Sequence, residues 1–273
     1  MRRTTLHDGQ PLWCLKATEA RVLDHHVQGY LDHGVRVEDG DVVLDVGANI
    51  GIFGVRAVQR HPGVRVFAFE PIPEIHDVLA ANARDYGDGR LVPLQCGVSD
   101  KPGTATFTYF PRSPALSTAS PEAWDEDPEE FEAAVTGTTR EPPPDLWYLR
   151  LVPGFLSPLL ARFLKGGAQE ITCELRTLSD VIDEHGLDRV DLLKVDCEGA
   201  ELPALRGLRD EHWARVSRVV VEVHDRDGAL QEVLGILDRQ GFVDVVTEKE
   251  DGFEDTRLVN VYASRGGTAA EAR

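Results

Sequence analysis

The sequence predicts a doubly wound α/β fold with an antiparallel edge strand and one long insertion. Apolar runs of strand length alternate with segments of helical periodicity, the pattern of a largely parallel sheet covered by helices on both faces. The first apolar run ends in a glycine-rich turn that leads directly into a helical segment. About sixty residues without this alternation then interrupt the series, which is too many for an ordinary connection.

The N-terminal segment, residues 1–41, is expected to form a cap over one end of the sheet. It carries a weak helical pattern of residues that recur at three- and four-residue spacing: Ala20, Leu23, Val27, Tyr30 and Leu31. The main domain is expected over residues 42–265, and the tail 266–273 is expected to be disordered.

Within the main domain the apolar patterns and turn signals give each element in order. The expected strands are 42–46, 65–69, 91–95, 104–109, 171–175, 191–195, 218–223, 242–247 and 257–263. The expected helices are 52–59, 73–85, 178–185, 200–208 and 228–240. A short acidic loop joins the last two strands, and this predicts the antiparallel edge.

The insertion covers residues 110–169 and is rich in proline and acidic residues. Its aromatic side chains are spread along it: Trp124, Trp147, Tyr148, Phe155 and Phe163. We expect a lid that binds the substrate, the alternative being a flexible, partly ordered excursion.

The composition fits one main globular domain and excludes some partners. The formal net charge of -18 and the lack of a basic run disfavour nucleic acid as substrate. No apolar stretch approaches the roughly 18–20 residues that span a bilayer, and residues 1–10 lack a signal-peptide core, so we expect a cytoplasmic protein without membrane contact. The four cysteines form no C-x-x-C pair, which argues against a zinc knuckle.

A first candidate site lies at the glycine-rich turn after the first strand. Its spacing is G-x-x-x-G-x-x-G, unlike the G-x-G-x-x-G of dinucleotide-binding proteins, and Asp45 precedes the first glycine. An acid is unsuited to pyrophosphate but suits a ligand with an ammonium group, such as S-adenosylmethionine. The turn residues expected around this cofactor are Gly47, Ala48, Asn49 and Gly51.

The next two strand ends complete the expected cofactor site. Glu70 follows the second strand, nineteen residues after Gly51, where a carboxylate accepts hydrogen bonds from both ribose hydroxyls. Gly97, Val98 and Ser99 follow the third strand, where their backbone and the Ser99 hydroxyl are expected at the adenine edge. Taken alone, this last segment is also an ordinary turn.

A second candidate site follows the strands 191–195 and 218–223. Lys194, Asp196 and Glu198 share one face if the strand extends that far, and Glu222 and His224 follow on the next strand. Ligands of open α/β sheets bind at the carboxyl ends of strands. The alternative is that Lys194 and Asp196 merely pair with one another, and that His224 is structural.

These motifs resemble those of the FkbM-type methyltransferases. The resemblance rests on residues 44–51, 69–71, 193–201 and 221–224 and covers roughly 40–263, leaving the long insertion outside it. It implies a Rossmann-like class I methyltransferase fold and dependence on S-adenosylmethionine. The matching cofactor positions are Asp45, Gly47, Asn49, Gly51 and Glu70. Members act chiefly on hydroxyls of natural products, sugars or lipids.

We therefore expect O-methyl transfer to a small-molecule hydroxyl, with His224 as general base and with Asp196 and Glu222 orienting it or the substrate. One alternative is a divalent metal held by Asp196, Glu198, Glu222 and His224. Less favoured are a nicotinamide oxidoreductase, a non-catalytic cofactor-binding protein and a nucleic-acid amino methyltransferase. The oligomeric state is left open, with a homodimer as one option.

Overall fold

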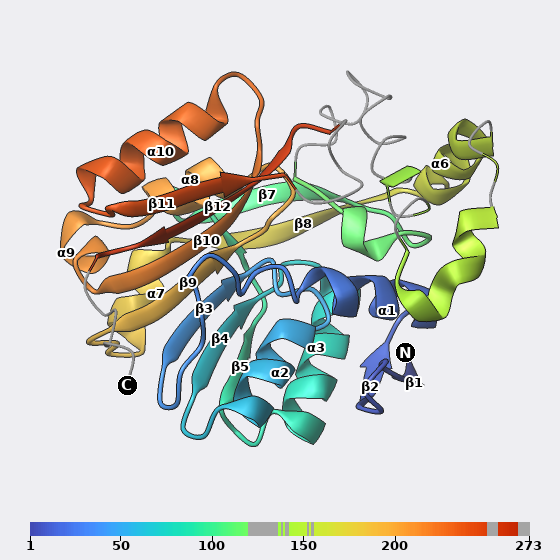
Figure 1. Ribbon diagram of the computed structural model, residues 1–273, viewed down its shortest axis with the longest axis horizontal. Coiled ribbons are helices and arrows are strands. Elements are labelled where there is room, and N and C mark those ends of the chain that lie inside the picture. The colour runs from blue at the N-terminus through green and yellow to red at the C-terminus, as the bar shows by residue number, and fades with distance from the viewer. Residues whose placement is uncertain are drawn as a thin grey trace.

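The computed structural model describes residues 1–119, 136, 137, 139, 142–151, 153, 156–249 and 256–266. A seven-stranded sheet forms its centre, with strand order β11-β12-β10-β9-β3-β4-β5 (Figure 1). Its members are β3 (Val42–Val46), β4 (Arg65–Phe69), β5 (Leu91–Leu94), β9 (Val190–Val195), β10 (Val216–His224), β11 (Asp244–Glu248) and β12 (Leu258–Ser264).

The pairing of these strands confirms the predicted fold. From β5 through β4, β3 and β9 to β10, every neighbouring pair is parallel. At the far end β12 runs antiparallel to both β10 and β11. The structure is therefore a doubly wound α/β sheet with the antiparallel strand near the edge, as the sequence indicated.

Helices cover both faces of the sheet because its strands are apolar on both sides. Val43 and Val66 belong to one hydrophobic core, and their neighbours Leu44 and Phe67 belong to the other. The first face carries β1 (Arg2–Thr5), β2 (Pro11–Cys14), α1 (Ala17–His26), α2 (Ile52–Arg60) and α3 (Pro73–Tyr86). The other carries α7 (Leu178–Glu184), α8 (Glu201–Arg206), α9 (Asp210–Trp213) and α10 (Ala229–Arg239).

Two predicted strands lie outside the main sheet, which corrects the expected series. A separate sheet contains β6 (Gly97–Val98), β7 (Gly103–Tyr109) and β8 (Gln169–Arg176), with β7 and β8 antiparallel. Both strands alternate buried and exposed side chains, such as buried Phe107 and exposed Glu174. A strand that is polar on one side is typical of an antiparallel sheet with one solvent-exposed face. It is not typical of a parallel sheet that helices cover on both faces.

The long insertion connects these two antiparallel strands. Tyr109 is paired directly with Gln169, so residues 110–168 leave and return at adjacent points. The described part contains η1 (Pro114–Leu116), η2 (Pro144–Leu151) and α6 (Ser157–Lys165). The aromatic residues Trp124 and Phe155 lie outside the described residues, as does the tail from 267 to 273.

No helix in the described parts of the chain is both long enough and apolar enough to cross a membrane.

Candidate active site

Close contact between the loops after β3 and β9 organises the site. Gly47 has a φ of 73°, and a Cβ there would lie 1.6 Å from the carbonyl oxygen of Asp196. Only glycine allows this approach, which is the physical reason for the first glycine of the motif. The backbone N–H of Asp196 in turn donates to the carbonyl of Val46 at 3.1 Å.

A buried lysine holds the same two loops together. The Nζ of Lys194 lies 3.0 Å from Oδ1 of Asp45 and 3.6 Å from Oδ2 of Asp196, and it donates to the carbonyl of Gly47 at 3.1 Å. Burial alone would lower the pKa of Lys194, but the carboxylates of Asp45 and Asp196 outweigh it and raise that pKa. Lys194 therefore stays cationic.

A cavity of about 1100 Å³ opens beside these loops. Most of the predicted site residues line it: Gly47, Asn49, Glu70, Gly97, Val98, Asp196, Glu222 and His224. Its volume exceeds what a drug-sized ligand fills, so it has room for a cofactor and an acceptor together.

Four predicted cofactor residues do not line this cavity. Asp45 is fully buried behind the wall against Lys194. Gly51 begins α2 with a φ of 83°, where a Cβ would meet Leu79. The backbone N–H of Ala48 donates to Phe69, and the Ser99 hydroxyl donates to Asp100. These residues shape the loops, and their direct contact with a cofactor stays a prediction.

Glu70 is a buried carboxylate on the cavity wall at the end of β4. Its Oε1 accepts from the backbone N–H of Ile72 at 2.9 Å. Burial raises its pKa to about 7, and the hydrogen bonds from the Ile72 and Asn49 backbones offset only part of this effect. With Ile72 and Val98 as apolar walls nearby, this set of groups fits an adenosine: carboxylate for ribose and apolar surface for the base.

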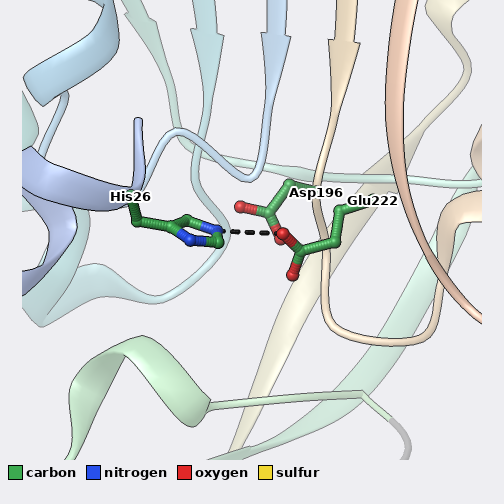
Figure 2. A group of neighbouring side chains, drawn as sticks. All are labelled: His26, Asp196 and Glu222. Carbon is green, nitrogen blue, oxygen red and sulfur yellow. Dashed lines mark hydrogen bonds and ion pairs between the residues drawn. The ribbon is translucent and has the colours of Figure 1, made fainter. Parts of the chain in front are cut away.

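Three further side chains converge in the cavity from three elements (Figure 2). His26 comes from the end of α1, Asp196 from the loop after β9 and Glu222 from β10. The Nε2 of His26 lies 2.9 Å from Oε2 of Glu222. Tyr30, just beyond α1, donates its hydroxyl to Oδ2 of Asp196 at 2.6 Å.

Sequence reasoning missed His26 and Tyr30 as site residues. Tyr30 was assigned to the apolar helical pattern, and its ring is indeed buried, but its hydroxyl reaches the site. The one local signal was that His26 and Tyr30 are four residues apart, a spacing that brings side chains together along a helical turn. Their rings contact each other edge to face, with 5.3 Å between the ring centroids. Nothing in residues 1–41 alone pointed to strands more than 150 residues away.

His224 is buried between two carboxylates, which opposes the predicted general-base role. Its Nε2 lies 3.4 Å from Glu198 and its Nδ1 3.4 Å from Glu201. Burial lowers the pKa of His224, but these carboxylates outweigh it and raise that pKa well above the usual value. A protonated imidazole donates and does not accept, so the base role stays a prediction that these contacts disfavour.

The four metal ligands expected from the sequence do not form one close group among the described residues, where Glu198 lies against His224 and the other two carboxylates lie beside His26. The groups there whose ligand atoms lie within 4.8 Å of one another are His26, Asp196 and Glu222, and the exposed Asp32, His33 and Glu248.

A doubly wound sheet, a buried carboxylate after β4 and a cavity at the carboxyl ends of the strands are typical of an enzyme that binds an adenosine-containing cofactor. Residues 45–243 match the model of the methyltransferase FkbM domain. The chain belongs to the FkbM methyltransferase family.

Three relatives illustrate the range of the family. The chain is 38% identical over 267 residues to the 31-O-demethyl-FK506 methyltransferase FkbM of Streptomyces tacrolimicus, with 95% of each chain covered. It is 36% identical to the methyltransferase sdnD of Sordaria araneosa, over 78% of this chain and 77% of that one. It is 26% identical to the hexuronic acid methyltransferase AglP of Haloferax volcanii, over 68% of this chain and 57% of that one.

Replacing Lys194 with methionine should destabilise the protein by about 3–5 kcal/mol, because Asp45 would be left buried without its counter-charge. Adding Asp45→Asn should recover part of that loss. Urea unfolding of both variants measures this, with the exposed Lys101→Met as control. A double variant no more stable than Lys194→Met would show that the two groups are not coupled.

Affinity for S-adenosylhomocysteine should rise as pH increases from 6 to 8. Ribose hydroxyls donate to the ionised carboxylate, and Glu70, with its pKa raised to about 7, ionises across this window. Glu70→Gln should weaken binding by about 1.5–3 kcal/mol at pH 8 and flatten the profile. Calorimetry at each pH tests this, with the exposed Glu74→Gln as control. If the affinity of Glu70→Gln still rises steeply with pH, a group other than Glu70 is responsible for the pH dependence.

His224→Gln should lower the free energy of unfolding by about 1.5–3 kcal/mol, since Glu198 and Glu201 lose the cation between them. His61→Gln offers a matched control, because His61 faces the exposed Asp39 at the surface and such pairs contribute about 0–1 kcal/mol. Equal stability of the two variants would mean that His224 is not the counter-ion.

Proposed function

We propose that this enzyme methylates a hydroxyl oxygen of a small molecule, either a natural product or a sugar. The observation that carries the proposal is the shared cavity, which is lined both by Glu70 of the predicted cofactor site and by the carboxylates of Asp196 and Glu222. S-adenosylmethionine supplies the methyl group when bound. The similarity to a 31-O-demethyl-FK506 methyltransferase and a hexuronic acid methyltransferase supports an oxygen acceptor.

The chain's own residues position the acceptor and receive its proton. Asp196 and Glu222 accept a hydrogen bond from the acceptor hydroxyl and aim its oxygen at the methyl carbon. The oxygen–carbon bond forms as the carbon–sulfur bond breaks, and sulfur keeps the electron pair. The hydroxyl proton leaves toward these carboxylates and the water beside them. This assignment moves proton transfer away from His224, whose neighbours keep it protonated.

The insertion supplies the acceptor wall of the cavity. Apolar side chains from its described part line the cavity: Pro142, Pro143, Leu149, Leu160, Phe163 and Leu164. This wall favours an acceptor with a large apolar body and a hydroxyl that reaches the carboxylates. These described residues of the insertion select the acceptor by contact with its apolar part.

Methyl transfer to a hydroxyl should be detected with S-adenosylmethionine carrying a ¹³C-labelled methyl group and a panel of macrolide alcohols and hexuronic acid glycosides. Mass spectrometry counts the transferred methyl groups, and NMR correlation from the methyl protons locates the atom that carries them. A methyl ether oxygen is expected. A label found on nitrogen or carbon would overturn the proposal, and Glu70→Gln, which should bind cofactor poorly, controls for label transfer without the enzyme's site.

A further inference from the structure

The side chains of His26, Asp196 and Glu222 have the spacing of ligands around one cation (Figure 2). One ligand atom from each lies within 4.8 Å of the other two. The Nε2 of His26 and the Oε2 of Glu222 lie 2.9 Å apart. Neighbouring ligands of an octahedral ion with bonds of about 2.1 Å lie about 3 Å apart, so this pair needs little movement to share an ion.

The charges around this group leave room for a cation. Lys194 lies closer to Asp45 than to Asp196, at 3.0 against 3.6 Å. Glu222 contacts His26 at 2.9 Å and lies on the cavity wall. Two carboxylates thus line the cavity, and the ammonium group beside Asp196, that of Lys194, also neutralises the fully buried Asp45. Carboxylates brought together in this way repel each other unless a cation joins them.

Asn260 adds an independent indication of a ligand. It is paired directly with Glu222 across the β10–β12 ladder, so both side chains stand on the same face of the sheet. Asn260 lines the same cavity and is only 7% exposed. Among the described residues no donor reaches its Oδ1. A buried amide oxygen without a donor is costly, and a cation at this face would satisfy it.

We propose that His26, Asp196 and Glu222, with the amide oxygen of Asn260, bind a divalent cation of the Mg²⁺ and Mn²⁺ class. Three oxygen donors and one imidazole form a set of mostly hard ligands that leaves coordination positions for water or substrate. This set differs from the one expected from the sequence, because α1 contributes His26 while Glu198 and His224 pair with each other.

The inference rests on the proposed function and gives the cation a role within it. The cation lies beside the carboxylates that face the acceptor hydroxyl, where it orients the hydroxyl and stabilises negative charge on its oxygen as the proton leaves to water. The methyl carbon then exchanges its bond to sulfur for a bond to that oxygen, and sulfur keeps the electron pair. Acceptors with a second oxygen beside the reacting hydroxyl would bind best, because two oxygens can occupy two open positions.

Electron paramagnetic resonance of Mn²⁺ tests the site without cofactor or acceptor. The full chain, first treated with a chelator, is titrated with Mn²⁺, and Glu222→Gln and Asp196→Asn should each weaken binding roughly 10- to 100-fold or more. Coupling of bound Mn²⁺ to an imidazole nitrogen should be present in the wild type and absent in His26→Gln. Thermal unfolding shows whether each variant is folded, and Asn260→Ala provides a fourth variant that leaves both carboxylates in place.

The exposed group formed by Asp32, His33 and Glu248 supplies matched controls. His33→Gln should retain the nitrogen coupling, and Glu248→Gln should bind Mn²⁺ as the wild type does. If the coupling is lost in His33→Gln and kept in His26→Gln, the proposal is wrong. It is equally wrong if folded wild-type protein binds no Mn²⁺. If methyl transfer then persists in the presence of a chelator, the proposed function is retained and only the cation site is rejected.

Discussion

The site depends on the burial of one cation, Lys194, at the junction of β3 and β9. Asp45 and Lys194 are paired positions on these neighbouring parallel strands, and both side chains point to the face that packs against α1. Removing an ammonium group from water costs several kcal/mol unless carboxylates and carbonyls replace the water. Here Asp45, Asp196 and the carbonyl of Gly47 do so. The loops after β3 and β9, which both line the cavity, are therefore held together by the same contacts that compensate the burial of Lys194.

The polar residues of the site share one face of the sheet because strand side chains alternate. Lys194 on β9, Glu222 and His224 on β10 and Asn260 on β12 all stand on the side covered by α1. A row of buried polar groups needs partners on the covering element. The region of α1 provides them, since His26 contacts Glu222 and Tyr30 donates to Asp196. The expected N-terminal cap is thus part of the site.

The sequence predicted the parts of the site that follow from strand geometry and missed those that follow from packing. Asp196 and Glu222 meet because adjacent parallel strands end at the same edge. Glu198 was predicted to share a face with Lys194 and Asp196, which is wrong, because β9 ends at Val195. Glu198 adopts a left-handed φ of 55° and lies 3.4 Å from His224. The approach of α1 depends on tertiary contacts that no local pattern records. The β7–β8 pairing was hidden by the length of the chain between them.

That pairing also explains how an insertion of this length is compatible with an ordered site. Its two ends are adjacent in the ladder, so the main sheet needs no change to accommodate what lies between them. The first described residues of the insertion are tied to the rest of the site. Thr118 donates to the carbonyl of Glu198 at 2.6 Å, and the backbone N–H of Ala115 donates to the half-buried Glu19 of α1 at 2.8 Å. The start of the insertion is therefore held against the two elements that present Asp196 and His26, and these contacts are separate from those of Lys194.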